Sequence, residues 1–143
     1  MNEALRDRVR ELFEQKYHCS HAMLMLSMEM RDIENPFLLR CLGGLGGGIQ
    51  CGKDCGTLTG AACLISSFSP QLGGDETGTG DVYKEPIQEL VAWFENEFGS
   101  TVCHEICEPV REKRLEYCPG VVASTFTKCM QILEARGVDV YQE

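Results

Sequence analysis

The stretch GGLGGGIQCGKDCGTLTGAAC, residues 43–63, places three cysteines and eight glycines within 21 residues. Glycine in regular structure costs roughly 0.5–1 kcal/mol of backbone entropy relative to alanine, so this density of glycine needs a compensating role. Three roles are open: a metal or cluster held by thiolates, a reactive thiol, or close packing of the backbone. The residues after Cys55 predict a helix over 56–68, in which Gly60 and Ala61 allow a second helix to approach closely.

The rest of the chain also predicts helices, because its apolar residues recur at helical spacing and it shows neither hairpin signals nor sustained alternation. The first helix contains Leu5 and Val9, and Asn2 is a candidate cap for it. We expect further helices over 20–31, from Pro36, over about 84–98, around 102–114 and over about 120–136. The sequence therefore predicts an all-α fold, with residues 1–143 forming a single-domain bundle of five or six helices and a Gly-rich cysteine loop.

The composition argues against several classes of protein. The chain has 143 residues, enough for one domain with a hydrophobic core, and 43% of them are hydrophobic. Its net charge of −9 disfavours binding to nucleic acid and to anionic membranes. The N-terminal residues have no apolar region typical of a signal peptide, and no apolar run is long enough to span a bilayer. We expect a cytoplasmic protein that meets a redox partner protein, and the sequence leaves a homodimer open.

Nine cysteines are the strongest chemical signal in the sequence. In a reducing cytosol such a number indicates metal, cluster or redox chemistry rather than a disulfide framework. Two pairs share the spacing Cys-x-x-x-Cys, namely Cys51/Cys55 and Cys103/Cys107. Neither pair has the Cys-x-x-Cys spacing of thioredoxin-like sites or of most zinc knuckles.

The position of Cys55 is the most informative of the nine. It follows the glycine loop and begins the predicted helix, where backbone N–H groups and the helix dipole lower the pKa of a thiol. The glycines also let backbone N–H groups approach whatever the sulfur binds, and such hydrogen bonds tune the potential of a cluster. We therefore expect Cys55 to have a functional role, with a lowered pKa.

Four segments carry a resemblance to a known family. They are YHCSHAML, GGLGGGI followed by CGTLTGA, FGSTVCHEIC, and YCPGVVASTF. Over residues 5–133 the chain resembles the family of redox-active proteins named for its C_GCAxxG_C_C cysteine pattern. The resemblance implies redox activity, and a related domain is attached to some haem-binding electron-transfer proteins.

By this resemblance the motif cysteines are Cys19, Cys55, Cys103 and Cys118. Thr57 departs from the pattern, since alanine is usual there. The cysteines additional to the pattern are Cys41, Cys51, Cys63, Cys107 and Cys129.

The first hypothesis is electron transfer or redox sensing through an iron–sulfur cluster held by the four motif cysteines, because thiolates are soft ligands. Cys51 and Cys107 are weaker candidates for ligands. The second hypothesis is a thiol–disulfide protein in which Cys55 is the nucleophile and Cys51 the resolving thiol. The third is a structural zinc module. Activity as an oxidoreductase stays open.

Three additional cysteines, Cys41, Cys63 and Cys129, are expected to pack in the core as small hydrophobic residues. His18 and His21 flank Cys19 and are possible metal ligands, but we expect them to be exposed or to cap a helix. The four methionines within residues 23–30 resemble a copper-binding run, yet their spread around a helix favours core packing.

Overall fold

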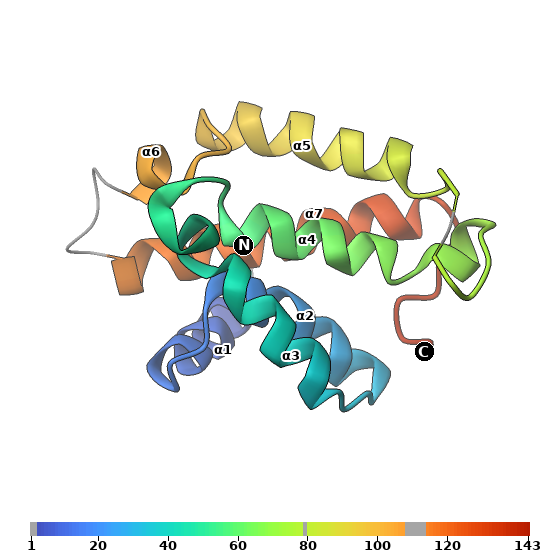
Figure 1. Cartoon of the computed structure of the whole chain (residues 1–143), viewed down its shortest axis with the longest axis horizontal. Helices are drawn as coiled ribbons and strands as arrows, with labels where there is room; N and C mark the ends of the chain where they lie inside the picture. Colours follow the sequence, from blue (N-terminus) through green and yellow to red (C-terminus); the bar gives the residue numbers. More distant parts are fainter. Residues whose placement is uncertain (1–2, 79, 108–113) are drawn as a thin grey trace.

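Seven α-helices and no strand are found in the residues that the structure, a computed structural model, describes: 3–78, 80–107 and 114–143 (Figure 1). The helices are α1 (Glu3–Glu14), α2 (Cys19–Arg31), α3 (Pro36–Leu42), α4 (Gly56–Ser66), α5 (Lys84–Phe98), α6 (Cys103–Cys107) and α7 (Arg114–Glu134). Short 3₁₀ turns follow α3 and α4, at Gly43–Leu45 and Ser69–Leu72. The all-α prediction is confirmed, and the number of helices exceeds the five or six expected. No helix in the described part of the chain has the length and apolar character needed to cross a membrane.

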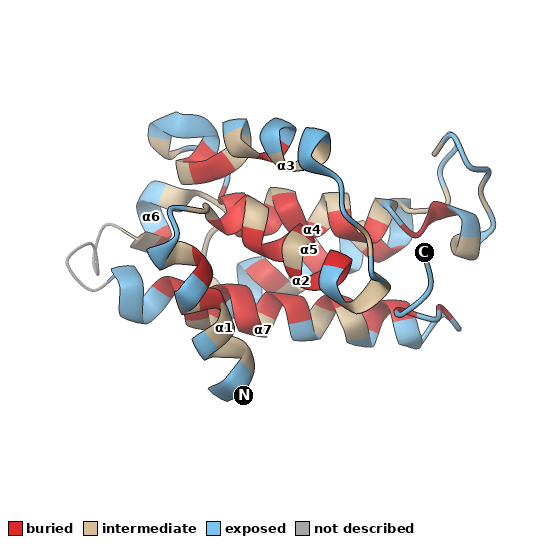
Figure 2. Ribbon diagram, turned by 90° about the horizontal axis from the view of Figure 1, so that it is seen from below, coloured by how far each residue is buried: buried red, intermediate tan, exposed pale blue. Residues whose placement is uncertain are grey.

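The hydrophobic core lies where α2, α4 and α7 meet. Helix α4 packs against both α2 and α7, while α5 covers α4 and α7 from the other side and α1 packs on α7. Figure 2 shows buried residues concentrated on these central helices. The largest fully buried side chains include Met23 of α2, Leu64 of α4, Phe94 of α5 and Phe68 after α4. Burial of such apolar side chains is the main source of stability for a bundle of this kind.

Gly60 allows the close contact between α2 and α4 that its position predicted. A Cβ at Gly60 would lie 3.0 Å from Ser20 Cα and 3.2 Å from Met23 Cβ, which is tighter than ordinary van der Waals contact. The hydroxyl of Ser20 in turn donates a hydrogen bond of 2.8 Å to the carbonyl of Leu42. Helices α2, α3 and α4 are therefore fixed together near the start of α2, where Cys19 lies.

Several helix boundaries agree with the sequence and others do not. Asn35 caps α3 by accepting a hydrogen bond of 3.0 Å from the Leu38 N–H, with Pro36 in the first turn as expected. Asn2, the expected cap of α1, lies outside the described residues. Helix α7 begins at Arg114 and continues through Pro119, whereas the sequence predicted a start near Gly120. Of the helix expected around 102–114, only α6 is described, since residues 108–113 lie outside the described part.

Two loops are joined by backbone hydrogen bonds at the end of the bundle where α4 begins. The Cys55 N–H donates to the Thr101 carbonyl at 2.8 Å, and the Cys103 N–H donates to the Lys53 carbonyl at 2.6 Å. These bonds flank an isolated antiparallel bridge between Asp54 and Val102. Figure 1 shows α6, the loop before α4 and the start of α7 at this same end. The bridge holds Cys55 and Cys103 in a fixed relation, although they lie 48 positions apart.

Candidate functional site

Five cysteines from four separate segments line one enclosed cavity. Cys19 begins α2, Cys55 precedes the first residue of α4, and Cys118 lies in α7. Cys103 and Cys107 are the first and last residues of α6. Thr57 and Arg114 also line the cavity. The four motif cysteines named in the sequence therefore come together, and Cys107 joins them.

Four of these thiols form a connected row. The sulfur atoms of Cys107 and Cys118 lie 3.4 Å apart. Cys19 also lies close enough to Cys118, and Cys103 close enough to Cys107, for the two members of each pair to shift each other's pKa. The row runs in the order Cys19, Cys118, Cys107 and Cys103, with Cys118 near its middle.

Proton sharing in this row separates the pKa values of its members. Hydrogen bonds to Cys107 and to Cys19, together with burial, raise the pKa of Cys118 far above its usual range, so Cys118 keeps its proton. A hydrogen bond from Cys118 lowers the pKa of Cys107 to about 6 and that of Cys19 to about 7. Because one S–H can donate one hydrogen bond at a time, Cys107 and Cys19 compete for the same proton. The row therefore favours a thiolate beside a protonated Cys118.

Cys55 behaves differently from the sequence expectation. Burial raises its pKa to about 12, and the charge of Cys19 adds to the rise. The N–H groups of Thr57 and Leu58 in the first turn of α4 act in the expected direction and lower the pKa, but they form no capping hydrogen bond of ordinary geometry. The prediction of a lowered pKa was wrong because desolvation of a nearly buried sulfur outweighs the helix start.

Thr57 supplies a buried hydroxyl next to these sulfurs. Its Oγ1 has no partner that meets ordinary hydrogen-bond geometry, yet its proximity lowers the pKa of both Cys19 and Cys55. The side chain is buried and lines the thiol cavity. A hydroxyl in this position can donate to a thiolate on either side, which alanine at position 57 could not do.

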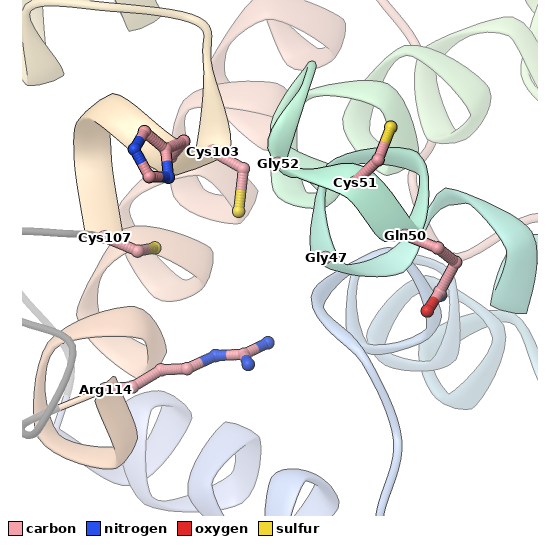
Figure 3. A pocket seen from close by; sticks show the side chains of 8 residues that line it. Gly47, Gln50, Cys51, Gly52, Cys103, Cys107 and Arg114 are labelled. Atoms are coloured by element: carbon pink, nitrogen blue, oxygen red, sulfur yellow. The ribbon is translucent and has the colours of Figure 1, made fainter.

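An open pocket of about 460 Å³ adjoins the thiol cavity (Figure 3). Gly47, Cys103, Cys107 and Arg114 line both spaces. In Figure 3 the guanidinium of Arg114 extends into this pocket and the sulfur of Cys103 faces the same space. Arg114 lowers the pKa of Cys19, Cys103 and Cys107 by its charge, although other effects leave the pKa of Cys103 raised to about 11.

The glycine loop forms one wall of this pocket with a left-handed turn. Gly47, Gly48, Ile49 and Gln50 all have φ between 57° and 66°. Such a conformation costs roughly 1–2 kcal/mol per residue other than glycine, so Ile49 and Gln50 are strained. Gly48 is required for a second reason, because a Cβ there would lie 2.6 Å from the Lys53 nitrogen and 2.8 Å from Cys103 Cβ. The glycines thus let the loop pass directly against α6.

Cys51 is not a member of the thiol row. It is exposed, its S–H lies 3.7 Å from the Gly48 carbonyl, and it lines the open pocket while Cys55 lines the enclosed cavity. Figure 3 shows its sulfur directed away from those of Cys103 and Cys107. The structure therefore gives the Cys51/Cys55 couple no contact, and Cys51 as a catalytic thiol or ligand stays a prediction from spacing.

The remaining cysteines divide by burial. Cys129 is fully buried in the core and burial raises its pKa to about 12, which confirms a packing role. Cys63 is half-buried and packs against the core. Cys41 is exposed, so the expectation that it packs in the core was wrong. It lies on α3, whose only buried residue is Leu42, and therefore faces away from the helices that α3 covers.

The histidines and methionines beside Cys19 have structural roles. His21 Nδ1 accepts a hydrogen bond of 2.9 Å from the His18 N–H, which places the pair at the N-terminus of α2 as caps. Met23 and Met28 are buried, while Met25 and Met30 pack against the core from a half-buried position. Both expectations are confirmed.

The comparison with known families agrees with the arrangement of the thiols. A family model described as "Putative redox-active protein (C_GCAxxG_C_C)" matches residues 17–132. The chain belongs to the C_GCAxxG_C_C family. The matched segment contains all five cysteines of the cavity. No curated protein and no solved structure matches the chain.

Of the five cysteines that line the thiol cavity, Cys107 is the one that the C_GCAxxG_C_C pattern does not include. The sequence contained a signal for it, since positions four apart share one face of a helix and Cys103 is a motif cysteine. Within 3–78, 80–107 and 114–143, no group of three or more His, Cys, Asp or Glu side chains has an arrangement suited to a metal ion. A zinc ion or an iron cluster held here would therefore need these side chains to move from the positions that the structure describes.

Proposed function

We propose that this C_GCAxxG_C_C protein transfers or senses electrons through an iron–sulfur cluster held by Cys19, Cys55, Cys103 and Cys118. The observation that supports the proposal is the convergence of these four thiols on one enclosed cavity from α2, the start of α4, α6 and α7. A dithiol enzyme needs two cysteines, and core packing does not require five in one place. Four thiolates are the usual ligand set of such clusters.

The chemistry of the donors fits this group. Thiolates are soft ligands and Cys19, Cys55 and Cys118 are buried, so a bound cluster would be shielded from water. The free space between the sulfurs, about 10 Å³, is roughly that of one water molecule. A cluster would therefore have to replace the thiol–thiol contacts, and the adjoining 460 Å³ pocket leaves room on the side of Cys103.

Arg114 and Thr57 would complete the site. A cluster supplies one-electron chemistry when it is bound. Four thiolates, three of them buried, carry negative charge that needs compensation, and the Arg114 guanidinium at the cavity wall provides a positive charge. Thr57 and the first-turn N–H groups of α4 lie near enough to lower the pKa of nearby thiols, Thr57 that of Cys19 and both groups that of Cys55, so they could donate to bound thiolates. Donors and charges of this kind set the potential of a cluster.

Anaerobic reconstitution of single-cysteine variants tests the proposed ligand set. Reduced protein is incubated with ferrous iron and sulfide, desalted, and analysed for bound iron, acid-labile sulfide and visible absorption. Cys55→Ser and Cys118→Ser should each lose most of the bound iron and sulfide, because each removes a buried ligand. Cys41→Ser, at an exposed position outside the centre, should bind as much as wild type.

Far-ultraviolet circular dichroism of each variant separates loss of ligand from loss of fold. Folded Cys55→Ser and Cys118→Ser proteins that bind iron and sulfide like wild type would contradict the proposal. So would a wild-type protein that takes up neither element.

A further inference from the structure

Cys107 and Cys118 differ in their access to solvent although their sulfurs are in contact. Cys118 is 3% exposed, whereas Cys107 is half-buried and lines the open pocket as well as the thiol cavity. A disulfide bond of about 2.0 Å would need the two sulfurs to approach by on the order of 1.4 Å, which side-chain rotation can supply. A small molecule in the pocket can therefore reach Cys107, and Cys107 alone can pass the reaction on to Cys118.

We propose that Cys107 and Cys118 form a reversible disulfide with a small anionic disulfide from the open pocket as the oxidant, and that this bond removes Cys118 from the cluster ligands. The second half of this statement rests on the proposed function. The first half concerns thiols alone and stands without it.

The exchange proceeds in two steps that balance. The Cys107 sulfur attacks one sulfur of the small disulfide RS–SR, so that a Cys107–SR bond forms, the RS–SR bond breaks and the first RSH leaves with the thiol proton. The Cys118 sulfur then attacks Cys107, so that the Cys107–Cys118 bond forms and the second RSH leaves with the Cys118 proton. Two protein thiols are oxidised by two electrons, and one small disulfide is reduced to two thiols.

The charge of the pocket indicates the class of oxidant. Arg114 extends into the pocket beside Cys107, and none of the described residues that line the pocket is an Asp or Glu. Among the residues that the structure describes, none has a carboxylate within ion-pair distance of the Arg114 guanidinium. A disulfide that carries carboxylates can therefore pair with Arg114 while its sulfur lies against Cys107. The net charge of −9 would repel the same molecule elsewhere on the surface.

The same bond connects thiol oxidation to the proposed cluster. Cys118 cannot be a ligand while its sulfur is bonded to Cys107, since a thiolate is needed to bind iron. Oxidation of the small-thiol pool would then keep the protein from taking up a cluster, and reduction would restore uptake. Cys107 would serve as the residue that makes uptake depend on thiol redox state.

Peptide mapping of reduced, metal-free protein tests the disulfide directly. The protein is treated with oxidised glutathione, an anionic disulfide, or with cystamine, a cationic one, then alkylated, digested and analysed by mass spectrometry. Wild type should yield a Cys107–Cys118 linked peptide, and Cys107→Ser should yield none. Cys51→Ser removes a different, exposed thiol that lines the same pocket. This control variant should form the Cys107–Cys118 linkage as wild type does. Absence of the linked peptide in folded wild type overturns the proposal whatever the protein does with iron.

The ratio of the two oxidation rates tests the role of Arg114. Arg114→Gln should lower the rate with oxidised glutathione relative to the rate with cystamine by about fivefold, as expected for the loss of one ion pair of roughly 1 kcal/mol. The ratio cancels any general change in thiol reactivity. Arg40→Gln, on α3 away from the pocket, should leave it unchanged. An unchanged ratio in Arg114→Gln would overturn the assignment of an anionic oxidant.

Uptake of iron and sulfide tests the connection to the cluster. Wild type oxidised with glutathione disulfide should take up less than a tenth of the iron bound by the reduced protein, and dithiothreitol should restore it. Oxidised wild type that takes up iron fully, with its linked peptide present, overturns the connection. Reduced wild type that takes up no iron overturns the connection together with the proposed function, while the linked peptide still decides the thiol chemistry.

Discussion

At Cys55 two electrostatic effects act on one thiol in opposite directions. The first-turn N–H groups of α4 favour the thiolate, and removal from water disfavours it. Burial leaves the pKa at about 12, so Cys55 is protonated at neutral pH unless a positively charged partner replaces the lost hydration. Iron bound at the site would be such a partner, so a raised pKa suits the proposed ligand role of Cys55 better than attack on a substrate.

Alkylation of the reduced, metal-free protein should therefore separate Cys107 from Cys55. The pKa of Cys107 is lowered to about 6, so its thiolate fraction rises as pH increases through 6 and is nearly complete by neutrality. Its rate of reaction with iodoacetamide should level off above about pH 7, while Cys55 should stay unmodified in folded protein. Mass spectrometry of digests over pH 5–9 gives both rates. A midpoint for Cys107 near the ordinary thiol value of about 8.5 would contradict the role of Cys118 as its hydrogen-bond donor.

Gly48 should be much less replaceable than its neighbour Gly47. Gly48→Ala adds a Cβ that meets the Lys53 backbone and Cys103, whereas Gly47→Ala adds one with nothing within 4 Å. Both positions have positive φ, so alanine adds roughly 1 kcal/mol of backbone strain in both variants. The difference between their free energies of unfolding therefore reports the clash alone. We expect Gly48→Ala to lose a further 1–3 kcal/mol, about the cost of overpacking, in the free energy of unfolding from urea titration. Equal stabilities would show that the loop does not press on α6.

At the level of elements, sequence patterns predicted the helices well and their ends less well. The apolar spacing of α2, α4 and α5 predicted their existence and nearly their bounds. Pro119 misled the prediction for α7, because proline removes one backbone N–H and usually ends a helix. Here it is buried in a helix of 21 residues, and packing of α7 against α1 and α4 outweighs the loss. As a result Cys118 lies within α7, where its sulfur contacts that of Cys107 in α6.

The candidate site was predictable where it depended on motif position and unpredictable where it depended on three-dimensional contact. The four motif cysteines Cys19, Cys55, Cys103 and Cys118 were named from the resemblance, and they line one cavity. The contact between Cys107 and Cys118 did not follow from the pattern, because it depends on how α6 and α7 are placed relative to each other, and no local pattern specifies that. The pKa of Cys55 was also beyond a local argument, since burial is a property of the folded whole.

The contact between α2 and α4 can be tested at Gly60. Gly60→Ala places a Cβ against the backbone of Ser20, so the two helices must separate slightly. The gain in helix propensity, about 1 kcal/mol, should be outweighed by this overpacking, with a net loss of roughly 1–2 kcal/mol in thermal or urea unfolding. Gly44→Ala, which has open space around the new Cβ, should change the free energy of unfolding by less than about 0.5 kcal/mol. A Gly60→Ala protein more stable than wild type would contradict the close approach.

On the scale of the whole molecule, the thiols and the final segment of the chain occupy different parts of the fold. The thiol centre lies where α4 begins, while the C-terminal residues return to the far ends of α2 and α4 (Figure 1). Arg31 connects the end of α2 to the end of α4 and to the C-terminal residues. Its guanidinium lies 3.9 Å over the ring of Phe68, and it donates hydrogen bonds to the Ser67 hydroxyl and the Gln142 carbonyl. Stability contributed there should be independent of the cysteines.

Arg31→Met should therefore reduce the free energy of unfolding by about 1–2 kcal/mol, through loss of the cation–π contact and of hydrogen bonds made by a charged donor. Arg40→Met removes a guanidinium 5.7 Å from the exposed ring of Phe37 and should cost little. Neither variant should change the reactivity of Cys107. Altered thiol reactivity in Arg31→Met would show that the two ends of the fold are coupled.

The most direct test of the central claim is the iron and acid-labile sulfide content of protein purified anaerobically from cells grown with iron, with its visible spectrum recorded on the same sample. The account predicts a coloured protein with iron and sulfide in equal molar amounts, bleached by air or by Cys55→Ser. Colourless protein with nine free thiols and no iron or sulfide, both as purified and after anaerobic reconstitution, would contradict it.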